Sequence, residues 1–248
     1  MTDFVIGFLL SMLIGVAAFK KESLDESGVI AALVLGTLLY GFTGWFGYGV
    51  LILFFVLSSV ISKFNPDKKS ARRNAIQVLA NGLIATIAGF FYYLYGNFEF
   101  LVMVVGSIAI AASDTWSSEI GRLSKHNPRH VFTFKVMGRG LSGGVSMLGF
   151  LASIIAGIVF GSLMFIQTNN LTLIFTVIIF AFFGSLLDSM LGTIQVKYRD
   201  KETKVIVEKP HENTEYYSGF TWMTNNKVNL MSNFLGVALL GVVLFYII

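Results

Sequence analysis

The chain has 248 residues, of which 55% are hydrophobic and 13% are charged, and its formal net charge is +4. Soluble domains contain about 25% charged residues, and their surfaces cannot accommodate this much apolar area, so the composition excludes a soluble globular protein and indicates a membrane protein. The sequence contains no cysteine, which excludes disulfide bonds and thiolate chemistry.

Long stretches without charged residues predict the membrane spans, since a spanning helix needs roughly 17–25 mainly apolar residues. The stretch 27–62 is long enough for two spans that turn at the glycine-rich segment 41–47, and the stretch 140–187 for two that turn at 167–170. We predict a single integral membrane domain, residues 1–248, built as an all-α, polytopic transmembrane helical bundle. About eight spans are expected, at residues 3–19, 28–43, 45–62, 74–95, 98–118, 141–165, 171–195 and 228–248.

The charged residues predict the orientation of these spans. All 18 lysines and arginines fall in the loops after the first, third, fifth and seventh spans, and the opposite side carries only Asp3 and Glu99. Because basic loops stay in the cytoplasm, we expect a multi-pass protein of the cell membrane with both termini outside and the charged loops, including 197–227, in the cytoplasm. Orientation accounts for the basic residues first, so no nucleic-acid partner is expected, and anionic lipids or phosphates are secondary partners.

Two carboxylates lie inside the predicted spans, Asp114 in the fifth and Asp188 in the seventh. Ionisable residues within a membrane are costly and usually functional. At 1.5 Å per residue, Asn81, Asp114 and Asp188 each lie about 10 Å inside the cytoplasmic boundary. This shared depth predicts a polar pocket open to the cytoplasm, with oxygen ligands that suit Mg²⁺ and phosphate. Amides expected near it are Gln77, Asn81, Gln195, Asn229 and Asn233, although amides also hydrogen-bond membrane helices together.

The segment 135–144 formally contains the pattern G-x-G-x-x-G before the sixth span. No strand of a βαβ unit precedes it, so a dinucleotide-binding fold is excluded. Gly143 and Gly144 lie just before a helix amino terminus, and Lys135 and Arg139 flank the glycines. Such a segment is either a flexible turn or a cradle in which backbone N–H groups bind phosphate.

These residues resemble an integral-membrane family that includes the plant phytyl-phosphate kinase of tocopherol synthesis and animal transmembrane protein 19. The resemblance covers residues 72–233 and is most specific around Asp114; most bacterial members are uncharacterised. Its motifs are Arg72-Arg73-Asn74 with residues 77–82, residues 113–121, residues 143–146, residues 184–189 with Gln195, and Asn225 with Val228-Asn229.

The resemblance implies a nucleotide-dependent lipid-phosphate kinase, which transfers a phosphoryl group from a nucleoside triphosphate (CTP or ATP) to a prenyl or phytyl monophosphate in the membrane. Asp114, Glu119 and Asp188 would be its catalytic carboxylates and hold Mg²⁺. Residues expected to bind nucleotide or substrate are Arg72, Arg73, Gln77, Asn81, Lys135, Arg139, Gly143, Gly144, Ser189, Gln195, Asn229 and Asn233.

The alternative function is a transporter or carrier of a lipid-linked or anionic solute, in which the same carboxylates couple transport to an ion. Transporter sites usually lie at the membrane midplane between inverted repeats. Here the polar residues gather toward one side and no inverted repeat is visible, which favours the enzyme.

Overall fold

The computed structural model describes residues 1–64 and 72–247. The end of the predicted span 228–248 and part of the charged loop after residue 63 lie outside these residues. Within them, seven helices are long and apolar enough to cross a membrane. The protein is therefore an all-α polytopic membrane protein with seven candidate spans. In chain order the helices are α1 (Thr2–Lys20), α2 (Glu26–Lys63), α3 (Ala75–Tyr95), α4 (Phe98–Gly121), α5 (Met147–Thr168), α6 (Leu171–Gly192) and α7 (Asn225–Ile247).

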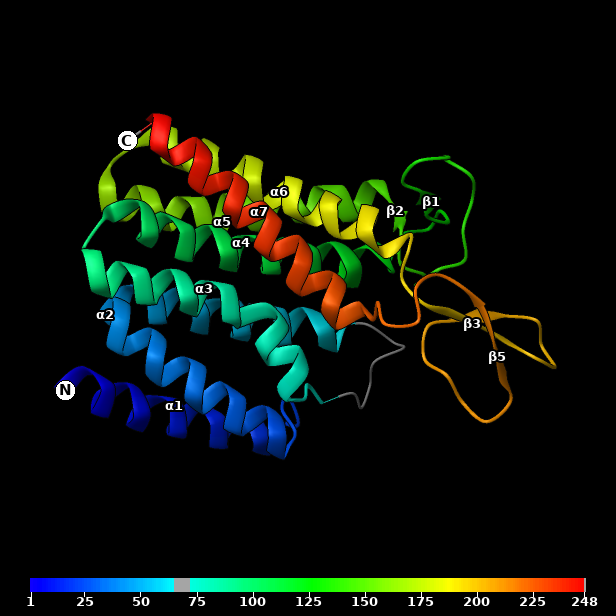
Figure 1. Cartoon of the computed structure of the whole chain (residues 1–248), viewed down its shortest axis with the longest axis horizontal. Coiled ribbons are helices and arrows are strands. Elements are labelled where there is room, and N and C mark those ends of the chain that lie inside the picture. Colours follow the sequence, from blue (N-terminus) through cyan, green and yellow to red (C-terminus); the bar gives the residue numbers. More distant parts are fainter. Residues whose placement is uncertain (65–71, 248) are drawn as a thin grey trace.

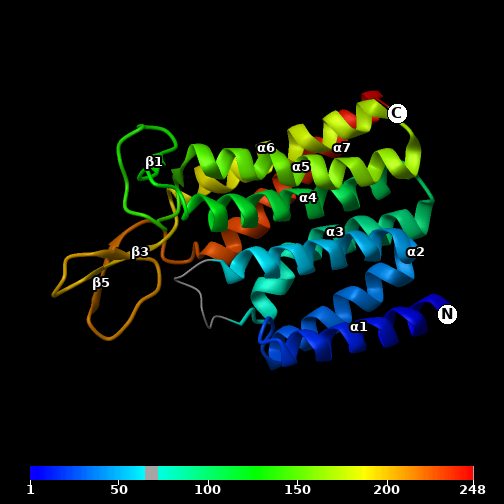
Figure 2. The same ribbon diagram turned by 180° about the vertical axis from the view of Figure 1, so that it is seen from behind.

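The 38-residue element α2 turns back on itself at Gly44. Gly44 has φ +65° and ψ −158°, a conformation that glycine adopts without a steric penalty. The ribbon of α2 runs away from the loop end of the bundle and then returns (Figures 1 and 2), and a Cβ atom on Gly36 would lie 3.3 Å from the Tyr48 ring. The structure thus has seven helical elements where about eight spans were predicted, because one glycine rather than a loop separates residues 28–43 from 45–62.

Two other predicted spans, 141–165 and 171–195, include residues that lie outside the helices α5 and α6. Helix α5 begins only at Met147, where the Ser146 hydroxyl accepts a hydrogen bond from the Gly149 amide at 3.1 Å and caps the helix. Residues 141–146 form a turn and a short strand instead. Helix α6 ends at Gly192, so residues 193–195 are not helical. An uncharged stretch predicts apolar surroundings, but it does not require helical backbone.

Helix α4 is the central helix of the bundle, and it packs against α2, α3, α5, α6 and α7. Its middle is made of small and aliphatic residues that are fully buried, such as Val105, Ile108 and Ala112. Glycines on the neighbouring helices let the backbones approach it closely. A Cβ on Gly184 of α6 would lie 2.5 Å from the Ile110 side chain. The middle of α4 is therefore enclosed by other helices.

Short strands gather at the end of the bundle opposite to both chain termini (Figure 1). Strands β1 (Arg129–His130) and β2 (Gly144–Val145) pair antiparallel. Strands β3 (Lys197–Asp200), β4 (Ile206–Val207) and β5 (Thr214–Ser218) form an antiparallel sheet in the order β4-β3-β5. The buried Lys197 ammonium donates to the carbonyl oxygens of Gly192 and Thr193, each at 3.3 Å, and so fastens the sheet to the end of α6.

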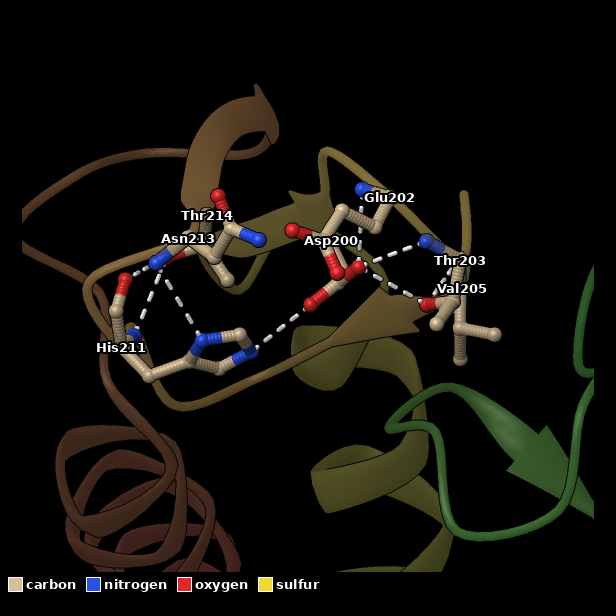
Figure 3. A network of polar contacts seen from close by, with 7 residues as sticks. All are labelled: Asp200, Glu202, Thr203, Val205, His211, Asn213 and Thr214. Atoms are coloured by element: carbon tan, nitrogen blue, oxygen red, sulfur yellow. Dashed lines mark hydrogen bonds and ion pairs between the residues drawn. The ribbon is translucent and has the colours of Figure 1, made fainter.

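Asp200 organises the loops of this sheet, as Figure 3 shows. Its Oδ1 accepts hydrogen bonds from the Thr203 amide at 2.7 Å, the Thr203 hydroxyl at 2.9 Å and the Glu202 amide at 3.0 Å. Its Oδ2 lies 3.3 Å from Nε2 of His211. The hydrogen bonds from Thr203 lower the pKa of Asp200 below its usual value of 3.8. One carboxylate thus joins the β3–β4 turn to the β4–β5 loop.

We expect the Asp200→Asn substitution to loosen this sheet at neutral pH. Because the folded-state pKa of Asp200 is lowered, its stabilising effect is present above pH 3.8 and is lost as the pH falls through the lowered pKa. Hydrogen exchange at the Thr203 and Glu202 amides should therefore be faster in the variant at pH 7. The Glu202→Gln variant is the control, and equal exchange rates in Asp200→Asn and the wild type would contradict the assignment.

Candidate functional site

A polar cavity of about 590 Å³ opens at the loop end of the bundle. This volume is in the range of small-molecule binding sites, about 300–1,000 Å³. Its walls come from the starts of α3 and α7, the ends of α4 and α6, the turn 139–146 and residues 208–210 of the sheet. Most of the predicted site residues line it: Arg72, Arg73, Gln77, Asn81, Asp114, Glu119, Arg139, Gly143, Gly144, Asp188, Ser189, Gln195 and Asn229.

Asp114 and Asp188 both line this cavity and lie close enough together for their carboxylates to interact, so they form a carboxylate pair. Asp188 Oδ2 also accepts from the Ser232 hydroxyl at 3.0 Å. When the Asn229 amide is oriented to donate, its nitrogen reaches Asp188 Oδ2 at 3.2 Å and the Asn225 carbonyl at 2.7 Å. Two carboxylates this close need a shared proton or a cation to offset their repulsion. The pair therefore has the character of a proton-binding or cation-binding site.

Glu119 is buried and neighbours Arg73 rather than this pair. Arg73 donates to the hydroxyls of Ser59 at 3.0 Å and Ser62 at 3.3 Å, and Ser62 donates to Glu119 at 3.3 Å. Burial lowers the pKa of the Arg73 guanidinium, and the charge of Glu119 acts in the opposite direction. Since arginine stays protonated in proteins, Arg73 is a partly buried cation at the cavity wall with Glu119 as its nearby counter-charge.

This arrangement changes the metal-ligand set that the sequence suggested. In the part of the chain that the structure describes, no group of three His, Cys, Asp or Glu residues is placed to hold a metal ion. Asp114 and Asp188 stand together, whereas Glu119 belongs to the surroundings of Arg73. Mg²⁺ is commonly held by one or two carboxylates together with waters and substrate phosphates. Asp114 and Asp188 are thus the carboxylates in this cavity that could hold such an ion.

Two basic side chains stand at the rim of the cavity. Arg72 forms an ion pair with Glu22 and lies over the Phe19 ring, 5.6 Å from its centroid. Arg139 donates to the Asn127 side chain at 3.3 Å and to the Lys125 carbonyl at 3.0 Å. Both contacts leave the guanidinium groups beside the cavity, where they can attract an anion.

Two of the predicted ligands lie outside the cavity lining. Lys135 is exposed in the turn between β1 and β2, where its carbonyl accepts from the His130 amide at 2.8 Å. Asn233 is buried deeper in the bundle and bonds twice to Ser107 of α4, through its Oδ1 at 2.7 Å and its Nδ2 at 3.0 Å. Asn233 thus joins α7 to α4. The sequence pattern does not distinguish the two asparagines of the last span, but of these two only Asn229 lines the cavity.

The glycine turn before α5 has the backbone that a cradle requires, with φ +79° at Gly140 and +88° at Gly143. A Cβ on Gly143 would lie 2.9 Å from the Thr193 side chain, so a larger residue does not fit. The Ser142 amide already donates to the carboxylate of Glu208 from the sheet. In this structure a protein carboxylate therefore occupies one of the amides expected to bind phosphate.

Sequence reasoning missed Glu208, Arg122, Thr224 and Asn226, which also line the cavity. The first two lie in loops whose charges were read as signals of orientation. Arg122 directly follows the motif 113–121, and this position in the sequence is the signal that could have identified Arg122 as a site residue. Nothing in the local sequence of Glu208 marks it, because the folding of β3 and β4 brings it to the cavity.

Comparison with known proteins places the chain in a family. The family model described as "Integral membrane protein DUF92" matches residues 9–237. The chain is 32% identical to Protein PGR of Arabidopsis thaliana, over 98% of this chain and 96% of that protein. It is 31% identical to an uncharacterised membrane protein of Methanocaldococcus jannaschii, over 84% of this chain and 87% of the other. It is 26% identical to Protein VTE6, chloroplastic, of Arabidopsis thaliana, over 86% of this chain and 63% of that protein. No solved structure matches the chain.

The Asn233→Ala substitution tests whether this amide is structural. Hydrogen bonds between membrane helices contribute about 0.6 kcal/mol on average and up to about 1.7 kcal/mol. We therefore expect the variant to lose about 0.6–1.7 kcal/mol of unfolding free energy in mild detergent, while ligand binding at the cavity is retained. Ser107→Ala and the double variant complete a cycle. Strictly additive losses would show that the two side chains do not interact.

Proposed function

The chain belongs to the DUF92 family of integral membrane proteins, and we propose that it is a membrane-embedded phosphotransferase, an isoprenoid monophosphate kinase that uses a nucleoside triphosphate and Mg²⁺. The observation that carries this proposal is the Asp114–Asp188 pair in a cavity that Arg73 and Arg139 also line. Phosphoryl transfer needs positioning and charge neutralisation rather than a protein nucleophile. The carboxylates would bind a divalent cation and the guanidinium groups would bind phosphate. Together they would supply the positioning and the charge neutralisation.

The proposal includes an orientation in the membrane. We infer that α2 crosses the membrane twice, which gives eight crossings and leaves both termini on the outer side. The glycine turn of α2 and the position of both termini at one end of the bundle support this count. The basic loops at the other end would then be cytoplasmic. The cavity would face the compartment that contains nucleoside triphosphates.

Each group in the cavity has a proposed role. Bound Mg²⁺ would be held by Asp114 and Asp188 and would neutralise charge on the phosphates. Arg73 and Arg139 would bind phosphate oxygens, and Glu119 would keep Arg73 charged and positioned. The bond from the terminal phosphorus to the bridging oxygen breaks, a bond to an acceptor phosphate oxygen forms, and nucleoside diphosphate leaves. Side chains proposed to orient the two substrates are Arg72, Gln77, Asn81, Ser189, Gln195 and Asn229.

The acceptor is proposed from the resemblance described above, since that family includes the plant phytyl-phosphate kinase. A lipid acceptor also agrees with a cavity that opens within a bundle of apolar helices. The donor is CTP or ATP, and the two are distinguished by the experiment below.

The test is transfer of labelled phosphate from CTP or ATP to a prenyl monophosphate by the purified protein with Mg²⁺. We expect Asp114→Asn and Asp188→Asn each to lower the rate by at least about 100-fold, the size seen when one charge-stabilising group is removed. Glu99→Gln changes a carboxylate at the opposite end of α4 and should leave the rate unchanged. Absence of transfer to prenyl monophosphates of any length, from either nucleotide, would reject the proposal.

An ion-coupled carrier is the second candidate, because a carboxylate pair inside a helix bundle also suits a protein that moves protons or cations. Proteoliposomes decide between the two functions. Uptake of an anionic solute that depends on an ion gradient and is abolished by Asp188→Asn, without any phosphoryl transfer, would establish the carrier.

A further inference from the structure

A second cavity lies between α1, both halves of α2 and α3, and its lining is mainly apolar. Its volume is about 70 Å³, measured as the space that the centre of a water-sized sphere can occupy. One water molecule needs roughly 10–15 Å³ by this measure, so the cavity has room for several non-hydrogen atoms. Ile14, Leu35, Ile52 and Phe54 are among its walls. Such a lining favours hydrocarbon over water or a charged group.

The apolar cavity adjoins the polar cavity, because three residues, Arg73, Gln77 and Asn81, line both. The Arg73 guanidinium lies over the Phe55 ring, 5.8 Å from its centroid, and Phe55 lines the apolar cavity. All three shared residues offer hydrogen-bond donors, and one is a cation. The entrance to an apolar cavity is therefore a place where an anion would be bound.

Toward its other end the apolar cavity is bounded by Ser11, Gly36 and Tyr48. Ser11 donates to the Tyr48 hydroxyl at 3.3 Å, so these polar groups partner each other and offer little to a ligand. Ser11 is nine residues before the end of α1 at Lys20, or about 14 Å along the helix axis. The cavity thus extends from the charged end of the bundle into its apolar interior.

Resting on the proposed function, we propose that the apolar cavity holds the part of the acceptor's hydrocarbon tail next to the phosphate, while the phosphate itself contacts Arg73. An amphipathic anion matches the two ends of this cavity, one cationic and one apolar. A nucleobase does not match, because the walls beyond Asn81 present few unpaired polar groups. The small volume holds only the first several carbons of the tail. The site therefore selects ligands by the shape of the tail near the phosphate, and the remainder of the tail extends between helices toward lipid.

Gly82 provides a way to fill the cavity from α3. A Cβ added there would meet only Leu35 Cδ1, at 2.8 Å, and this atom is the end of a flexible side chain. Gly49, in the second half of α2, is exposed and a Cβ there would meet nothing within 4 Å. Gly82→Leu and Gly49→Leu are thus the same substitution, one inside the cavity and one outside it.

The experiment measures binding of geranyl monophosphate and of inorganic phosphate to the detergent-purified protein with Mg²⁺ by titration calorimetry. Gly82→Leu should weaken geranyl monophosphate binding about tenfold or more, the effect of excluding roughly two buried methylene groups, and leave inorganic phosphate binding unchanged. Gly49→Leu should change neither. Arg73→Gln should weaken both, because it removes the cation that the phosphate contacts.

A second filling variant, Ile52→Phe, approaches the cavity from α2 and replaces Gly82→Leu if thermal unfolding shows that the latter is misfolded. If folded filling variants bind geranyl monophosphate as tightly as the wild type, the tail site is overturned while the kinase proposal stands on label transfer. If the wild type transfers no label but binds geranyl monophosphate through this cavity, the kinase proposal fails and the tail site remains.

Discussion

Two carboxylates placed side by side on the wall of a cavity between helices repel one another, because they are screened less there than in bulk water. Something must lie between Asp114 and Asp188, either a proton or a cation, and the surrounding structure must hold both side chains against that repulsion. Ser232 and Asn229 do so from α7, and α4 and α6 carry the acids. The carboxylate pair and its partners therefore link α4, α6 and α7 at the cavity, in addition to the apolar packing between these helices.

Helix α4 meets this requirement because it is enclosed on most sides. Its apolar middle packs tightly against glycines of the neighbouring helices, and its polar residues find partners among them. Ser113 donates to the Ser153 carbonyl of α5 at 2.8 Å, and Trp116 donates to Ser58 of α2 at 3.0 Å. Polar groups in a membrane interior must be satisfied by protein. The result is a rigid helix that presents Asp114 and Glu119 in different directions.

The sequence predicts the features that depend on local pattern. Uncharged stretches locate the helices, and the acids inside them locate the cavity, because both reflect the cost of charge in lipid. Features that depend on tertiary contact escaped prediction. Asn229 and Asn233 lie four residues apart on the same helix, and the sequence does not distinguish them. In the structure Asn229 contacts Asp188, whereas Asn233 contacts Ser107. Glu119 was grouped with the two aspartates, but folding brings it near Arg73 instead.

The backbone departures also lay beyond the sequence pattern. A glycine-rich segment indicates a turn, but it does not show that Gly44 alone makes it. The residues before α5 are uncharged and could have been helical; positive φ at Gly143 and the cap at Ser146 exclude this. The cavity between α1, α2 and α3 has no signal at all in the sequence, because it is a gap left by side chains from separate helices.

The contact between Glu208 and the Ser142 amide means that the protein supplies an anion to its own glycine turn. A phosphate that binds this amide must displace the carboxylate of Glu208, which follows strand β4. The apparent affinity of the turn for an anion is then the intrinsic affinity multiplied by the fraction of molecules in which Glu208 has moved away. Glu208 thereby raises the ligand concentration that is needed to half-fill this turn.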